Sequence, residues 1–130
     1  MSGYDRNQRR IEQLMNLGRN LARRASSACE ICEQSGRPLK PYEVPPLPDE
    51  PNLEHAVLAC DDCRMAMDGG PMNDDEWRAL SGPMWSAVPP IQVSAVRLIR
   101  RLADTGIQWA KDDLDGLYLE PEVQAWVDDC

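Results

Sequence analysis

Two pairs of cysteines with identical spacing constrain this chain more than any other feature of its sequence. The motif CxxC occurs as "CEIC", with Cys29 and Cys32, and again as "CDDC", with Cys60 and Cys63. A CxxC turn brings its two sulfur atoms to one side of the backbone, and two such turns supply four thiolates at the corners of a tetrahedron. The sequence therefore predicts a Cys₄ metal site.

Zinc is the expected metal, with one ion per chain. Iron in a rubredoxin-like site is the open alternative, because no neighbouring residue excludes it. A disulfide framework is disfavoured, because the fifth cysteine, Cys130, makes the number odd and because thiols stay reduced in the cytoplasm. A thioredoxin-type redox site needs a low-pKa CxxC in a βαβ setting, and the pattern shows none. Cys130 is expected to be a free thiol.

The number of ligands predicts what the metal does. Four cysteines fill every coordination position of zinc, whereas a catalytic zinc keeps one position open for water or substrate. We therefore expect a structural ion, whose binding energy also supports the folding of a small domain.

The order CxxC, hairpin, CxxC also occurs in HNH nucleases, which need a histidine near the segment "PYEVPP". Here Tyr42 and Glu43 stand in that segment. The single histidine, His55, precedes the second predicted strand and is expected to be a surface or second-shell residue. No catalytic residue is therefore predicted.

Charge is unevenly distributed along the chain. The net charge is -8, but residues 1–28 contain six arginines and only two acidic residues. Duplex binding normally needs a basic footprint, which the chain as a whole lacks. We expect the basic segment to dock on the acidic body, and the alternative is a contact with nucleic acid.

The opening "MSGYDRNQRRIEQ" lacks the apolar core of a signal peptide, and no apolar run could cross a membrane, so a cytoplasmic protein is expected.

The overall pattern predicts one domain over residues 1–130. It comprises an N-terminal helix at 6–28, a Cys₄ module at 29–69 and a helical extension at 70–130. The expected fold class is mostly α with a small β-hairpin, in a zinc-ribbon or treble-clef-like arrangement. The N-terminal helix is expected to run directly into Cys29.

Local signals predict the individual elements. Strands are expected at Leu39–Val44 and at residues 55–60, on either side of a proline-rich loop. The strongest helical pattern is "PPIQVSAVRLIRRLADTG", with prolines at its start and Gly106 at its end. Shorter helices are expected at three further places: after an N-cap at Asn73, at Ile107–Asp115 and at Glu122–Asp128.

Two sets of side chains in the helical extension are assigned by their spacing. One set should lie on the exposed face of the long helix and offer a contact surface to a partner: Arg97, Arg100 and Arg101. The other set is expected to anchor the core rather than to stack on bases: Trp77, Trp85, Trp109 and Trp126.

The chain resembles the zinc-ribbon module of the PhnA proteins, a family named for an alkylphosphonate-utilisation gene cluster. Five stretches carry the resemblance: "CEIC", "YEVPP", "VLACDDC", "MWSAVPPIQVSAVRLIRRL" and "DGLYLEPEVQAW". The resemblance implies that the four paired cysteines bind zinc. The chain departs from the family in two ways: Glu33 stands where a glycine commonly follows the first CxxC, and the small β domain of larger members does not follow.

These features favour a non-enzymatic interaction or regulatory module with a structural zinc ion and an unknown protein partner. The alternative is a nucleic-acid-associated regulator that uses the arginine-rich N-terminal helix. A phosphonate-related hydrolase follows from the family name alone, and a closed Cys₄ site offers such an enzyme no open metal position.

Overall fold

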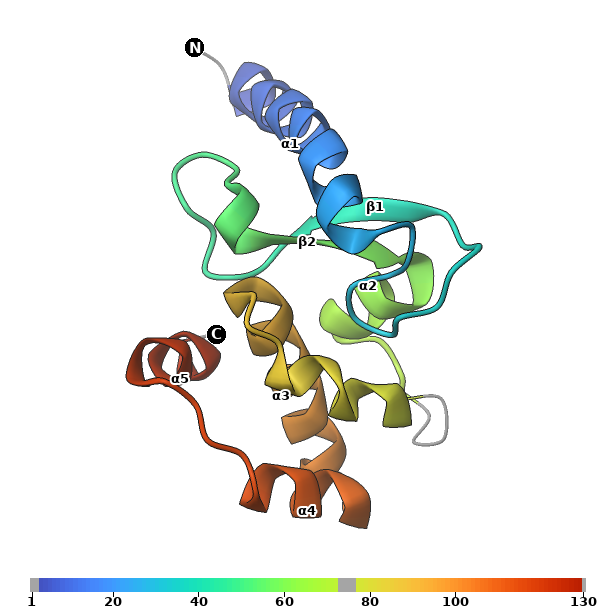
Figure 1. The fold of residues 1–130 in the computed structure, drawn as a ribbon. Coiled ribbons are helices and arrows are strands. Elements are labelled where there is room, and N and C mark those ends of the chain that lie inside the picture. Colours follow the sequence, from blue (N-terminus) through green and yellow to red (C-terminus); the bar gives the residue numbers. More distant parts are fainter. Residues whose placement is uncertain (1–2, 73–76, 130) are drawn as a thin grey trace.

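The computed structural model describes residues 3–72 and 77–129, and it consists mainly of helices around one small β-hairpin (Figure 1). The predicted fold class is therefore confirmed. The predicted N-cap Asn73 and Cys130 lie outside the described residues. None of the described helices is long and apolar enough to cross a membrane.

The elements are, in chain order, α1 (Gly3–Ala25), β1 (Leu39–Glu43), η1 (Leu53–His55), β2 (Ala56–Cys60), α2 (Asp61–Met67), η2 (Arg78–Ser81), η3 (Pro83–Trp85), α3 (Pro89–Asp104), α4 (Gln108–Asp115) and α5 (Pro121–Asp128).

Helix α1 presents leucines at helical spacing, including Leu14 and Leu21, to the hairpin beneath it. It begins at Gly3 rather than at residue 6 and ends at Ala25 rather than at residue 28. It ends there because Ser26 and Ser27 adopt left-handed conformations, with φ of 54° and 69°. The prediction that the helix runs directly into Cys29 is therefore wrong, since a turn separates the two.

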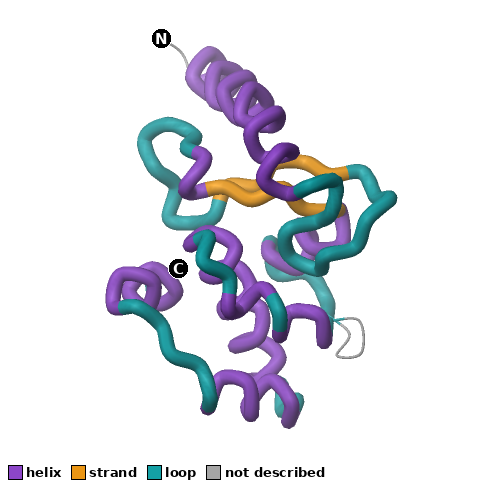
Figure 2. The backbone as a smooth tube through the Cα atoms, viewed as in Figure 1, coloured by secondary structure: helices purple, strands orange, loops and turns teal. Residues whose placement is uncertain are grey.

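Strands β1 and β2 pair antiparallel along their whole length, and each is one residue shorter than predicted. All five residues of β2 are buried, because the two faces of the strand belong to different cores. Ala56 and Leu58 pack against α1, whereas Val57 and Ala59 belong to the main core around α3. The hairpin thus lies between α1 on one side and α3 on the other (Figure 2).

Helix α3 forms the centre of the main core. Pro89 and Pro90 begin it, and Gly106, with φ of 96°, follows its end as predicted. The helix contacts β2, α2, α4, α5 and η3. It is therefore buried around most of its circumference rather than along one apolar face, through Pro90, Ile91, Val93, Ser94, Ala95, Val96, Leu98, Ile99 and Leu102.

Two of the three arginines expected on an exposed face of α3 are held by carbonyl groups of the chain itself. Arg97 donates hydrogen bonds to four backbone carbonyl oxygens, those of Pro45, Trp126, Val127 and Asp129. Arg101 donates to two more, those of Ala66 and Gly70. Most of these carbonyls lie at the C-terminal ends of α5 and α2, where a helix leaves its last carbonyl groups unpaired. Arg100 forms an ion pair with Asp128, and its side chain is 38% exposed.

The four tryptophans do not all anchor the core. Trp77 is buried, and Trp109 and Trp126 are partly buried against the main core. Trp85 is 53% exposed, because the short turn η3 leaves its ring at the surface. The expectation is therefore wrong for Trp85.

Candidate metal centre

Three segments of the chain bring the four predicted cysteines together. Cys29 and Cys32 lie in the knuckle between α1 and β1, Cys60 is the last residue of β2, and Cys63 lies in the first turn of α2. All four side chains are buried, and none is more than 9% exposed. Knuckle, hairpin and helix N-terminus follow one another in the predicted treble-clef-like order.

The spacing of the sulfur atoms fits a tetrahedral metal site. The Sγ atoms of Cys29 and Cys63 are 3.7 Å apart, those of Cys32 and Cys60 are 3.8 Å apart, and all four lie within 4.8 Å of one another. A tetrahedron with Zn–S bonds of about 2.3 Å has sulfur–sulfur edges of roughly 3.8 Å. The residues present therefore fit one Zn²⁺ ion, and the same geometry accepts iron.

Backbone amides point at one of the sulfur atoms. The amide nitrogens of Ile31, Cys32 and Cys60 lie 3.4, 3.5 and 3.4 Å from the Sγ atom of Cys29, to which they donate. Such hydrogen bonds favour the thiolate, because they place positive partial charge next to it. The knuckle backbone thus prepares Cys29 to act as a metal ligand.

The proximity of the four thiols shifts their pKa values in opposite directions. Hydrogen bonds from the Cys32 and Cys63 thiols, followed by those from backbone amides, lower the pKa of Cys29. The hydrogen bond with Cys29 raises the pKa of Cys32 to about 11, and those with Cys29 and Cys32 raise the pKa of Cys63. Four buried sulfur atoms at this spacing cannot all ionise unless a cation compensates their charge. A divalent metal ion would supply that compensation.

A buried carboxylate locks the knuckle to α1 and to the hairpin. Glu30 is 8% exposed and accepts two hydrogen bonds from Arg24, at 2.8 and 2.9 Å, and one from the Leu58 amide, at 2.8 Å. Arg24 also donates to the carbonyl oxygens of Leu53 and Ala56. A bidentate pair with this many hydrogen bonds fixes the position of both side chains. Sequence reasoning missed the pair, although an acidic residue between two predicted ligands was a visible signal.

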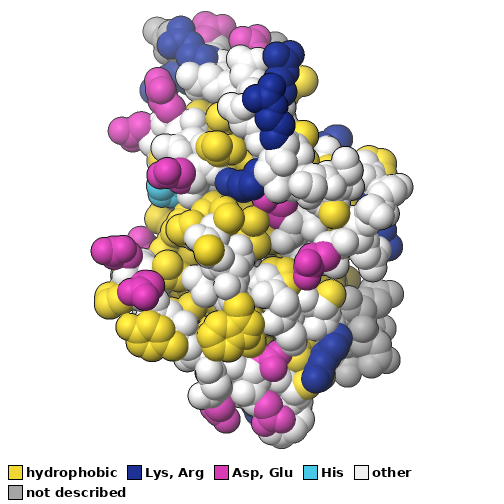
Figure 3. Space-filling model, viewed as in Figure 1, with side chains coloured by type: hydrophobic (Ala, Val, Ile, Leu, Met, Phe, Trp, Pro, Cys, Tyr) yellow, Lys and Arg dark blue, Asp and Glu magenta, His cyan; other side chains and the backbone are white. Residues whose placement is uncertain are grey.

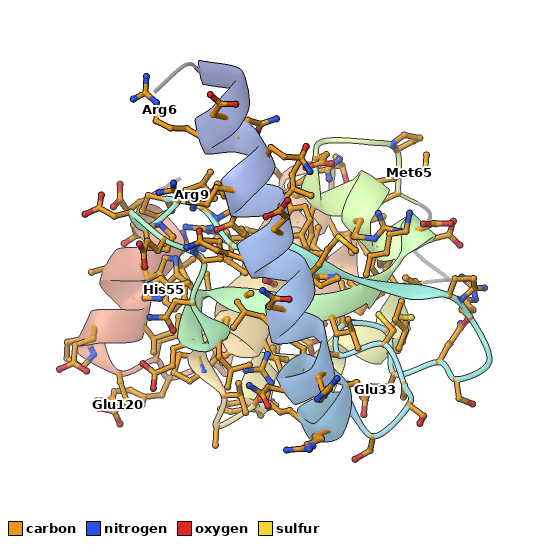
Figure 4. All side chains as sticks on the ribbon, turned by 90° about the horizontal axis from the view of Figure 1, so that it is seen from above. Arg6, Arg9, Glu33, His55, Met65 and Glu120 are labelled. Carbon is orange, nitrogen blue, oxygen red and sulfur yellow. The ribbon has the colours of Figure 1, made fainter. Side chains whose placement is uncertain are left out.

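The knuckle turns at Glu33 through a left-handed backbone conformation. Its φ of 64° is left-handed, which is the conformation that glycine adopts without steric cost. The Glu33 amide donates to the Cys29 carbonyl at 2.9 Å, and the Cys29 amide donates to the Gln34 carbonyl at 3.0 Å. The side chain lies near the carboxyl end of α1 (Figure 4), where it lines a cavity together with Arg24. The knuckle therefore turns at a residue that is not glycine, at the cost of backbone strain.

A polar pocket of about 160 Å³ opens beside the sulfur atoms. Three of the four cysteines line it with Gln34, Arg37, Asp62 and Trp77. Arg37 and Asp62 form an exposed ion pair at 2.7 Å, and the Nε1 atom of Trp77 is buried with no hydrogen-bond partner among the described residues. A Cys₄ zinc centre carries a net charge of about -2, because four thiolates outweigh one Zn²⁺. The Arg37 guanidinium is the positive group on this side of the centre.

The single histidine lies away from the cysteines. His55 precedes β2 and is therefore at the opposite end of that strand from Cys60. Its ring packs on that of Trp126 with a centroid distance of 4.8 Å, and its Nδ1 atom is buried with no partner among the described residues. His55 is thus a partly buried packing residue and not a second-shell residue of the metal centre.

The two residues that stand where an HNH nuclease needs a histidine have structural partners. The Tyr42 hydroxyl donates a hydrogen bond to Asp68 at 2.9 Å. The pKa of Tyr42 is raised, first because the hydroxyl is buried and second because it bonds to this carboxylate. Glu43 accepts two hydrogen bonds from Arg10 of α1, at 2.6 and 2.8 Å. Neither residue lies beside the cysteines, because Tyr42 pairs with Val57 and Glu43 pairs with Ala56, at the end of the hairpin opposite Cys60.

The basic helix does dock on its own chain, but only in part. Arg10 and Arg24 pair with glutamates of the Cys₄ module rather than with the acidic C-terminal segment. The other four arginines of α1 are exposed and have no ion-pair partner within residues 3–72 and 77–129: Arg6, Arg9, Arg19 and Arg23.

Comparison with known proteins finds no matching family model, no matching curated protein and no matching solved structure.

Proposed function

We propose that the protein is a non-enzymatic interaction module in which one Zn²⁺ ion is a structural staple. The observation that supports this most directly is the closed set of four buried sulfur atoms contributed by the knuckle, β2 and α2. Such a set leaves no coordination position for water or substrate. The ion would hold the three segments together, and the partner would be another protein.

We also propose that the chain is a PhnA-like protein of the cytoplasm. The five sequence stretches described above support the family, and the left-handed backbone at Glu33 matches the glycine of such modules. Four clustered thiols suit a reducing compartment, where they stay available to a metal. The family name alone carries the link to phosphonates, and no residue of the centre is left free to act on one.

Removal of one ligand tests the structural role of the metal. Cys60→Ser should release the ion and abolish the cooperative thermal transition followed by circular dichroism, because metal binding energy is also folding energy here. Cys130→Ser is the matched control and should melt as the parent protein does. Unchanged cooperative melting of Cys60→Ser would contradict the proposal.

A nucleic-acid-associated regulator is the second candidate, and the exposed arginines of α1 favour it. Figure 3 shows basic side chains concentrated at the α1 end of the molecule, and Figure 4 shows Arg6 and Arg9 projecting from that helix. If α1 grips phosphates, affinity for short DNA or RNA must fall steeply with salt. We expect no sub-micromolar binding at physiological salt, because the acidic body repels phosphate. Tight binding in an anisotropy titration, lost on Arg9→Glu with Arg23→Glu, would instead establish this candidate.

A further inference from the structure

Helix α1 carries an apolar stripe that its own chain does not cover. Met15 is 70% exposed and Ile11 is 43% exposed, whereas Leu14, Leu17 and Leu21 pack against the hairpin side. At 3.6 residues per turn, the exposed pair lies about 100° around the helix from these leucines. The N-terminal end of α1 also extends away from the rest of the fold (Figure 1). The stripe is therefore accessible to a second molecule along the outer part of the helix.

Gly18 lies between this stripe and the hairpin, where it is half-buried, and packing within the chain does not require a glycine there. A Cβ atom added at Gly18 would meet only the Pro41 ring, at 3.9 Å, which is an ordinary van der Waals distance. Alanine would fit there, and glycine is among the least favourable residues in a helix interior. Gly18 and Ala22 lie one turn apart on the same side as Met15. Small residues at this spacing allow a neighbouring helix to approach closely.

Two opposite charges flank the stripe on one side. Glu12 and Arg19 are exposed, lie next to Met15 on the helix surface, and have no ion-pair partner among the described residues. They are nearly symmetric about Met15 along the chain. In a parallel pair of α1 helices, Glu12 would lie beside Glu12 of the partner subunit and Arg19 beside Arg19 of the partner subunit. In an antiparallel pair, Glu12 of each subunit would lie beside Arg19 of the partner subunit. For a second copy of the chain, this charge pattern therefore favours the antiparallel orientation.

We infer that the chain forms a two-fold symmetric dimer through antiparallel packing of α1 on α1 of a second copy, centred at Met15. Each Met15 packs on Met15 of the partner subunit. Each Ile11 lies over the notch formed by Gly18 and Ala22 of the partner subunit, as a knob fits a hole. The two Glu12–Arg19 pairs set the register. One helix face per subunit makes a small interface, so the dimer is reversible and depends on protein concentration.

Sedimentation velocity of the zinc-loaded full chain tests this inference. At about 100 µM the parent protein should sediment as a dimer and dissociate on dilution. Met15→Lys should be monomeric at the same concentration and should keep its zinc and its helical circular dichroism. Met65→Lys is the matched control, because Met65 is 60% exposed on α2, well apart from α1 (Figure 4). The Met65→Lys variant should remain dimeric.

Two further variants separate this interface from a general loss of stability. Glu12→Arg or Arg19→Glu alone should weaken the dimer roughly tenfold, and the two changes together should restore it, because the symmetric pairs are re-formed with reversed charges. Gly18→Ala should raise the melting temperature of the monomer and weaken the dimer. Three results would overturn the inference. They are a parent protein that is monomeric at every concentration, a dimer that survives Met15→Lys, and a dimer that Met65→Lys weakens as much as Met15→Lys does. Zinc content is measured on the same samples. A monomeric protein that keeps its zinc would overturn the dimer without contradicting the proposed metal site.

Discussion

Glu33 adopts a backbone conformation that is unfavourable for any residue with a Cβ atom. Its φ of 64° lies in the left-handed region, and it is kept there by the hydrogen bonds that close the knuckle around Cys29. Cys29 and Cys32 both precede Glu33 and hold their sulfur atoms in the buried cluster, so the residue at which the chain then turns must accept the strain. A single residue thus shows how the ligand geometry dictates the local backbone.

Replacing Glu33 by Gly should therefore stabilise the zinc-loaded protein by about 1 kcal/mol, since glycine adopts this conformation without steric strain. Urea unfolding measures the change. Glu33→Ala is the control, because it removes the same carboxylate but keeps the Cβ atom and the strain. Equal stabilisation by both variants would show that the side chain, and not the backbone, is the unfavourable feature.

At the scale of the elements, α3 organises the molecule through its arginines as well as through its apolar residues. Arg101 reaches the C-terminal end of α2, which carries the ligand Cys63 in its first turn, and Arg97 reaches the C-terminal end of α5. Each guanidinium donates to carbonyl groups at a helix end, where the regular hydrogen bonds of the helix stop. The helix that fills the core therefore also holds the ends of its neighbours.

Arg101→Ala should destabilise the protein by about 2 kcal/mol, because it leaves the carbonyl groups of Ala66 and Gly70 without their charged donor. Arg100→Ala is the matched control on the same helix, and its exposed pair with Asp128 should contribute little. Denaturant unfolding of the two variants provides the comparison. Equal effects would mean that the carbonyl contacts of Arg101 do not matter for stability.

Sequence patterns predicted the elements that depend on neighbours in the chain. The hairpin and α3 follow from proline and glycine positions and from apolar spacing, and the Cys₄ cluster follows from the two CxxC motifs. What the patterns missed depends on partners distant in sequence. The pairing of Glu30 with Arg24 and the clamp of Arg101 on α2 need tertiary contacts, and the spacing of α3 gives no indication that other elements cover its arginines. The end of α1 was missed because two serines can continue a helix or stop it.

At the scale of the whole molecule, the chain is electrically polarised. Residues 104–129 contain eight acidic residues and one lysine, and they form the end of the fold that lies away from α1 (Figures 1 and 3). Helix α1 exposes four arginines at the other end. Because α1 docks on the Cys₄ module and not on the acidic segment, these charges remain separate and would orient an approaching partner. The cysteine cluster lies between the two ends, where the knuckle, β2 and α2 meet.

Elemental analysis of the purified, folded chain determines whether the cysteine cluster holds a metal ion and which ion it is. The account predicts one zinc per chain in protein prepared without added metal, with the same ratio in Cys130→Ser, because four buried sulfur atoms at tetrahedral spacing suit this ion. Iron at one per chain would contradict the assignment of zinc. A cooperatively folded protein without any metal would contradict the structural role itself.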